Sequence, residues 1–183
     1  SEAYGRGTGP NVDADPENKL LGHFPLLPRL EMETLRDSVL QVTGQLDMKN
    51  GGPSSPMSDD NKRRSLYLAV SRTRLDPAMA LFDFPDANGT ADERAITTGP
   101  LQGLYWLNSD FIIKQTNLLY ERLNPDDDGD AELIQRAYKL IYCRPPDDAE
   151  VRLGMEFLAT AGANAWPKYL QALLGSSEFS SVN

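Results

Sequence analysis

The sequence predicts a mainly α fold, a compact bundle of about six or seven helices with at most one short β-hairpin or strand pair. Apolar side chains recur three or four residues apart through most of the chain from residue 28 onward, and glycine and proline separate these runs. Only residues 66–71 alternate in β-favouring residues. We therefore expect helix-on-helix packing.

The chain is expected to be one domain preceded by an arm, since 183 residues lie within the usual size of a single domain. Residues 1–17 are rich in Gly, Pro, Asn and Asp and lack apolar periodicity, which predicts a flexible linker or arm. Residues 18–183 are expected to form a single helical domain.

Four elements are expected in the first half of this domain. Gly44 is typical of a helix end, and the turn-forming residues after it predict an exposed loop. Leu66, Leu68 and Val70 alternate with other residues as in a strand. In order, the elements are a helix at 28–44, a loop at 47–63, a strand at 66–71 and a short helix at 77–82 capped by Asp76.

Five helices are expected in the second half of the domain. Asp147 and Glu150 have capping-box spacing, so the helix after them is expected to turn Val151, Met155 and Leu158 toward the core. The expected helices are one at 99–107 with Leu101, Leu104 and Leu107, one at 109–123, one at 133–141 stopped by Pro145, one at 147–162 and one at 166–174 capped by Gly175.

The charge balance argues against nucleic acid as a partner. Acidic residues number 27 against 18 basic ones, for a net charge of −9, whereas phosphate-backbone binding depends on clustered Lys and Arg. No run of about 18 apolar residues occurs, so no membrane span is predicted in this fragment.

Residues for nucleophilic or metal chemistry are scarce. His23 is the only histidine and lies beside apolar residues, which favours a structural role. Cys143 is the only cysteine and is interpreted as a small core residue, although the neighbouring Arg144 could lower its pKa. Haem attachment and zinc sites need more Cys or His, so we expect no catalytic, cofactor or metal site in this domain.

The acidic turn at 124–132 partly matches a calcium-binding loop. Asn124, Asp126 and Asp128 provide oxygens at the first, third and fifth positions before Gly129. The twelfth position holds Gln135 where a bidentate Glu is needed, so a solvated helix start is the preferred interpretation over calcium.

Two groups of polar residues are candidates for an interaction surface. Asp83 and Asp86 lie beside aromatic residues and could act as a carboxylate pair, although turn formation explains them equally well. A basic region in an otherwise acidic chain could dock an anionic partner, or its side chains could form ion pairs with Glu31, Glu33 and Asp37. Its residues are Lys62, Arg63, Arg64, Arg72 and Arg74.

Several segments together resemble a known family, the planctomycete-specific domain of unknown function at the C-terminal end of large exported cytochrome-c-type proteins. The segments are PRLEMETLRDSVLQVTGQLD (28–47), GGP (51–53), RRSLYLAVSRTR (63–74), LFDFPD (81–86), TTGPLQGLYWLNSDF (97–111) and ALLGSSEF (172–179).

What the resemblance implies is context rather than chemistry. It implies a periplasmic, cell-envelope or secreted location, a companion domain, and haem only in an upstream segment of the parent protein. It supplies no catalytic residue. The polar residues that match the family's motifs have no known role. They are Arg29, Glu31, Arg36, Asp37, Arg72, Arg74, Asp83, Thr97, Thr98, Gln102 and Asn108.

Three functions stay open at the level of sequence. The first is a non-catalytic accessory module that packs against a companion domain, which predicts an exposed apolar or mixed patch near RRSLYL and TTGPLQ. The second is carbohydrate binding or hydrolysis, which needs an exposed flat ring such as Trp106 or Tyr105. The third is a docking surface for an electron-transfer partner, formed by the basic region.

Overall fold

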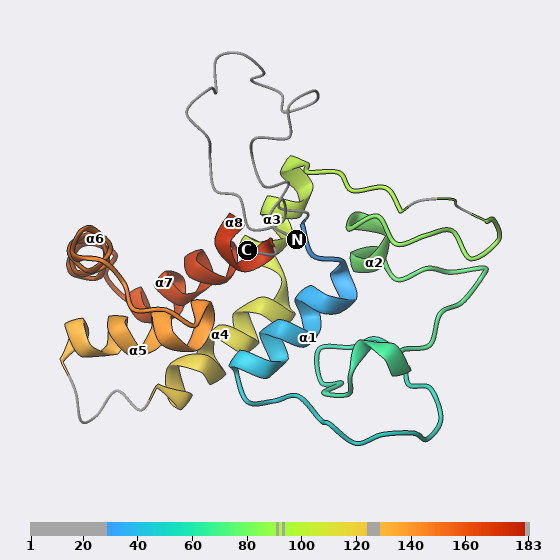
Figure 1. The fold of residues 1–183 in the computed structure, drawn as a ribbon, viewed down its shortest axis with the longest axis horizontal. Coiled ribbons are helices and arrows are strands. Elements are labelled where there is room, and N and C mark those ends of the chain that lie inside the picture. The colour runs from blue at the N-terminus through green and yellow to red at the C-terminus, as the bar shows by residue number, and fades with distance from the viewer. Residues whose placement is uncertain (1–28, 91, 93, 124–128, 182–183) are drawn as a thin grey trace, which may run out of the picture.

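The computed structural model describes residues 29–90, 92, 94–123 and 129–181, and over these residues the chain is helical without a β-strand (Figure 1). The mainly α prediction is confirmed. The helices are α1 (Met32–Val42), α2 (Pro77–Leu81), α3 (Pro100–Asn108), α4 (Asp110–Arg122), α5 (Asp130–Tyr142), α6 (Asp148–Thr160), α7 (Ala165–Leu174) and α8 (Ser177–Ser180), with a 3-10 turn, η2, at Ser65–Tyr67.

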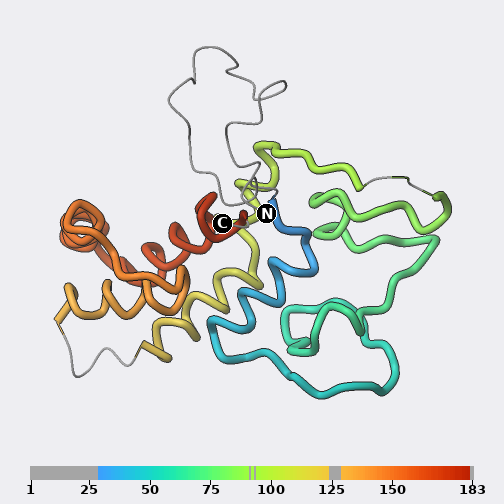
Figure 2. The backbone as a smooth tube through the Cα atoms, in the orientation of Figure 1, coloured from blue at the N-terminus to red at the C-terminus, as the bar shows by residue number. Residues whose placement is uncertain are grey.

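The helices cover only part of the molecule, and extended loops form the rest. In Figure 2 the long α1 and α4 pass through the centre, α5, α6 and α7 lie on one side, and the loops between α1 and α3 lie on the other. The core contains the apolar faces of α1, α4, α5 and α7, and α4 packs most extensively against α7. Its most deeply buried side chains include Leu35, Leu40, Ile112, Leu119, Ile134, Leu170 and Leu174.

Helix ends follow the chemistry that the sequence predicted. The Asp76 carboxylate accepts from the N–H of Ala78 at 2.9 Å, and Pro77 opens α2. Asp147 and Glu150 form both bonds of the capping box, each at 2.8 Å. Gly44 has φ +72° just beyond α1, a left-handed conformation that suits glycine.

The predicted strand at 66–71 is wrong. Ser65–Tyr67 form the 3-10 turn η2, and the residues that follow make only an isolated bridge between Ser55 and Leu68. Leu68 is buried, but Leu66 and Val70 are exposed, so the alternation does not mark one buried face. A strand needs a ladder of bonds to a neighbour, and here the neighbouring segment contributes only Ser55, which bonds to the backbone of Tyr67 and Ala69.

Arg144 joins three helices at one end of the bundle. Its guanidinium bonds both oxygens of Glu150 in α6 and both oxygens of Glu178 in α8, at 2.6 to 2.8 Å. It also lies over the rings of Tyr138 and Tyr142 in α5. Burial raises the pKa of Tyr142 to about 12, so its hydroxyl stays protonated and donates to the carbonyl of Leu173 at 2.8 Å.

Gly154 allows close contact between α6 and α7, and the predicted apolar face is confirmed for Val151 and Leu158 but not for Met155. Met155 is exposed, and Val151 and Leu158 are half-buried, which corrects the expectation that Met155 points into the core. Gly154 is the one buried residue of α6. A Cβ atom there would lie 2.6 Å from the Tyr169 hydroxyl and 2.9 Å from Cδ1 of Ile134.

We expect Gly154→Ala to destabilise the fold by about 1–3 kcal/mol, because the added methyl overlaps Tyr169 and forces the helices apart. Gly103→Ala is the matched control, since Gly103 in α3 has no atom within 4 Å of its virtual Cβ. That substitution is expected to be neutral or to stabilise by up to about 1 kcal/mol. Urea unfolding of both variants measures the difference, and equal effects would contradict the packing argument.

Candidate functional site

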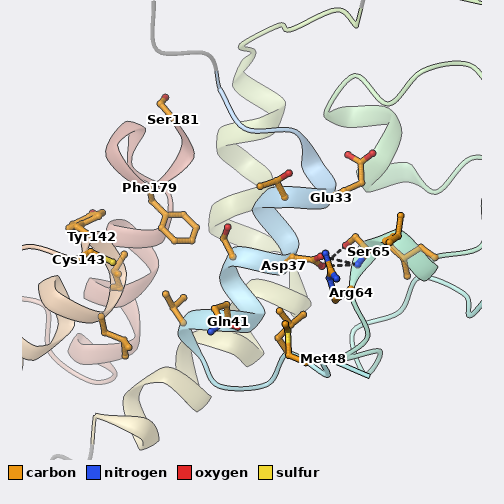
Figure 3. A pocket seen from close by; sticks show the side chains of 18 of the residues that line it. Glu33, Asp37, Gln41, Met48, Arg64, Ser65, Tyr142, Cys143, Phe179 and Ser181 are labelled. Atoms are coloured by element: carbon orange, nitrogen blue, oxygen red, sulfur yellow. Dashed lines mark hydrogen bonds between the residues drawn. The ribbon is translucent and has the colours of Figure 1, made fainter. Parts of the chain in front are cut away.

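An open groove with a volume of about 1230 Å³ lies over the outer face of α1 (Figure 3). Its floor is α1, and its two sides come from segments far apart in the sequence. One side includes Met48 and residues 64–70, and the other includes the end of α5 and the short helix α8. Figure 3 shows Arg64 and Met48 on one side of α1 and Tyr142 and Phe179 on the other.

The side formed by residues 64–70 is attached to α1 by two adjacent residues of the helix. Asp37 accepts from the backbone N–H of Ser65 at 2.8 and 3.0 Å and from its hydroxyl at 2.7 Å. Arg36 donates to the carbonyls of Arg63 and Asn61 and to the Ser65 hydroxyl. We call these contacts the Arg36–Asp37 clamp.

Arg36 is almost completely enclosed, with its side chain 1% exposed. Burial lowers the pKa of its guanidinium, opposed by the nearby Asp37 and Tyr105. An arginine nevertheless stays charged, so the cation must be satisfied locally. The carbonyls, the Asp37 carboxylate at 3.5 Å and the ring of Phe111 at 5.7 Å provide this environment.

We expect Arg36→Met to lower the free energy of unfolding by about 3 kcal/mol, because two carbonyls and a hydroxyl lose a charged donor. The substitution also releases residues 61–65 from α1, so limited proteolysis within 47–70 should become faster. Arg152→Met is the control at an exposed position of α6, with an expected change within about 0.5 kcal/mol. Unchanged proteolysis in Arg36→Met would contradict the clamp.

Asp83 is the centre of a second polar cluster. It has φ +63°, and its carboxylate accepts from Arg29 at 2.8 Å and from the N–H and hydroxyl of Thr97 at 2.8 and 2.7 Å. Arg94 donates to the Asp83 carbonyl and pairs bidentately with Glu33 at 2.8 and 3.0 Å. Three of the motif segments, which include Arg29, Asp83 and Thr97, therefore meet here.

The pKa of Asp83 lies below its ordinary value of 3.8. Burial acts to raise it, but the two bonds from Thr97 and the charges of Arg29 and Arg94 outweigh burial. Because the folded-state pKa is depressed, ionised Asp83 stabilises the fold at neutral pH. That contribution is lost as the pH falls from about 4 through the folded-state pKa.

We therefore expect Asp83→Asn to be less stable than the wild type at pH 7 and to lose less stability between pH 5 and pH 2. Asparagine tolerates a left-handed backbone, so the substitution isolates the charge. Asp86→Asn is the control, because Asp86 is exposed and its carboxylate accepts, among the described residues, only from Asn88 in the same turn. Parallel pH profiles of the wild type and Asp83→Asn, measured by urea unfolding, would refute the assignment.

Asp83 and Asp86, the possible carboxylate pair, have different surroundings. Asp83 is committed to Arg29 and Thr97, while Asp86 closes a turn. Trp106 is only 8% exposed, and Tyr105 is half-buried against Phe82, so the carbohydrate hypothesis loses the open ring on which it depended.

Gln102 and Asn108, the other candidate surface residues, make internal bonds. The Gln102 side chain is buried and donates to the carbonyl of Leu81 at 2.9 Å, which ties α3 to the end of α2. Asn108 is exposed and donates to the carbonyl of Leu104 at 3.1 Å, one turn earlier in α3. Both bonds support the local backbone around α3.

The predicted basic region divides into residues with different surroundings. Arg63 lies over the Tyr67 ring at 4.4 Å and donates to the carbonyls of Gly51 and Pro53. Arg64 lines the groove, and Arg72 and Arg74 are exposed on the loop before α2. The acids proposed as their partners pair with other arginines, Glu31 and Glu33 with Arg94 and Asp37 with Arg36.

The remaining chemical candidates have mixed outcomes. Cys143 is exposed and ends α5 with φ +59°, so its interpretation as a core residue is wrong. His23 and the possible calcium ligands Asp126 and Asp128 lie outside the described residues. Among the residues that are described, no group of three or more Cys, His, Asp and Glu side chains could hold a metal ion.

The leucines of α3 face solvent. Leu101, Leu104 and Leu107 are 65%, 50% and 59% exposed, because Gln102 and Trp106 occupy the buried side of the helix. Ile96, just upstream, is exposed as well. Leu66 and Val70 are exposed on a separate segment, so exposed apolar side chains occur near both TTGPLQ and RRSLYL.

The fold is a helical module. Polar residues of the motif segments quoted above, such as Arg36 and Asp83, hold distant parts of the chain together. Residues 1–158 match the model of the PSD1 family, described as "Protein of unknown function (DUF1553)". The match covers most of the chain, so the chain belongs to this family. No curated protein and no solved structure matches the chain in the corresponding comparisons.

The family match ends inside α6, but the packed unit continues beyond it. Leu170 and Leu174 of α7 are fully buried in the same core as α1 and α4. The ALLGSSEF segment also lies past the matched residues. No helix in the described ranges is both long and apolar enough to cross a membrane.

Proposed function

We propose that this domain is a non-catalytic interaction module that packs against a companion domain of a larger exported, cytochrome-c-type protein. The main support is the leucine face of α3, formed by Leu101, Leu104 and Leu107. Three exposed leucines on adjacent turns of one helix are typical of a surface that a partner covers. Haem belongs to an upstream segment of the parent protein in this proposal.

The local structure holds the leucine face in a fixed orientation. Gln171 of α7 donates to the carbonyls of Trp106 and Leu107 at 2.8 and 3.0 Å, which closes the C-terminal end of α3. Gln102 anchors the other end through Leu81. A helix fixed at both ends can dock a partner with little loss of conformational entropy.

The location of the parent protein in the periplasm, cell envelope or medium is part of the same proposal and follows from the sequence resemblance alone.

Co-purification with the segment immediately upstream in the parent protein tests this function. We expect one complex by size-exclusion chromatography, and Leu101→Ser with Leu104→Ser to weaken it by about tenfold or more, since each lost leucine contact contributes about 1–2 kcal/mol. Leu153→Ser on α6 is the matched control, because Leu153 is 68% exposed but lies on another helix.

Two results would count against the proposal. Independent elution of the two segments at high concentration would remove the companion-domain role. A complex that the α3 variants and the Leu153 variant weaken equally would place the interface elsewhere than the leucine face.

A further inference from the structure

The groove over α1 has features that the companion-domain proposal does not use. Its floor presents Thr34, Ser38 and Gln41, which lie on one face of α1 at four- and three-residue spacing. Their side chains form no hydrogen bond with any part of the described chain, in contrast to Arg36 and Asp37 beside them. The floor therefore offers a row of uncharged donors and acceptors with free capacity.

The two sides of the groove are largely apolar. Met48, Leu66 and Val70 on the loop side are all exposed, and Leu66 is 73% exposed. Leu140 and Tyr142 line the opposite side and are half-buried. A polar floor between apolar sides fits an extended peptide, because successive side chains of an extended chain point to opposite sides while its backbone groups stay free to bond.

A helical occupant fits this arrangement less well. The backbone groups of a helix are bonded internally except at its ends, so they could not use Thr34, Ser38 and Gln41. The length also suits an extended segment. The 11 residues of α1 span about 16 Å, which an extended chain covers in about five residues.

The groove holds both paired and unpaired charges. Each carboxylate that lines it has an arginine partner, Glu33 with Arg94, Asp37 with Arg36 and Glu178 with Arg144, and Arg94 and Arg144 are shared with Glu31 and Glu150. The two lining arginines, Arg64 and Arg122, have no carboxylate partner among the described residues. Arg122 instead donates to the carbonyls of Gln41 and Val42 at the end of α1.

We propose that the α1 groove binds an extended, acidic peptide segment of a partner protein, with apolar side chains inserted against Met48, Leu66 and Val70. Acidic side chains of the peptide pair with Arg64 and Arg122, and its backbone bonds to Thr34, Ser38 and Gln41. In a chain whose net charge is −9, Arg64 and Arg122 give the groove two cations that an acidic peptide could pair with. The inference goes beyond the companion-domain function and concerns a different surface.

Fluorescence anisotropy with three short labelled peptides tests the proposal. One alternates leucine and glutamate, one has lysine in place of glutamate, and one has serine in place of leucine. We expect the leucine–glutamate peptide to bind about tenfold or more tightly than the other two, and its affinity to fall as salt is raised. Equal binding of the lysine peptide, or no binding of any peptide, would overturn the proposal.

Variants locate the binding in the groove. Arg64→Gln and Leu66→Ser should each weaken binding of the leucine–glutamate peptide about fivefold or more, while Arg152→Gln and Leu153→Ser on α6 should leave it unchanged. Ser38→Tyr provides a second route, because it fills the groove without altering either side. Wild-type affinity in the Arg64, Leu66 and Ser38 variants, with folding confirmed by circular dichroism, would overturn the assignment.

One further variant separates this inference from the companion-domain proposal. Leu104→Ser on α3 should weaken the companion complex but leave peptide binding unchanged. If Leu104→Ser abolished peptide binding, the α3 surface and not the groove would be the peptide site, and the inference would fail.

Discussion

The buried guanidinium of Arg36 and its neighbour Asp37 form the contact on which one half of the molecule depends. Between Gly44 and Asp76 only Ser65 and Leu68 are buried, and the only regular element is the short turn η2. This segment cannot be held by apolar burial alone, since it removes too little apolar surface from water to offset the cost of ordering it. Polar bonds from α1 supply the attachment and place one side of the groove.

The two halves of the structure are therefore stabilised by different interactions, one by apolar packing and the other by polar contacts. The α4, α5 and α7 half is a conventional packed core with Leu119, Ile134 and Leu170 at its centre. The loop half is joined by arginine and carboxylate contacts, among them Arg29 with Asp83 and Arg94 with Glu33. Several residues of the motif segments, including Arg36 and Asp83, thus hold parts of the chain together.

Helix ends could be predicted where local capping chemistry sets them, whereas the helix expected from residue 28 begins at Met32, where the Glu31 side chain makes no cap bond. The capping box of Asp147 and the Asp76–Pro77 start act within a few residues, so the sequence contains all that determines them. Helix orientation depends on distant residues. The spacing of Leu101, Leu104 and Leu107 defines an apolar face of α3, but Trp106 and Gln102 take the buried side through contacts with other elements.

The same distinction applies to the candidate site. The basic character of residues 62–74 was visible in the sequence. Only the fold shows that Arg63 bonds to backbone carbonyls while Arg64 lines the groove. The groove itself combines α1, residues 46–70 and the chain from 140 onward, and no local pattern links these segments. The meeting of Asp83 with Thr97 and Arg29 is likewise a tertiary contact.

The exposed position of Cys143 has a practical consequence. It is the single cysteine of the chain, it lies at the end of α5, and it lines the groove (Figure 3). A maleimide dye or a nitroxide spin label would therefore attach at one defined place without any prior mutagenesis. The natural sequence thus provides a spectroscopic reporter at the surface where an approaching molecule would change its mobility and solvent exposure.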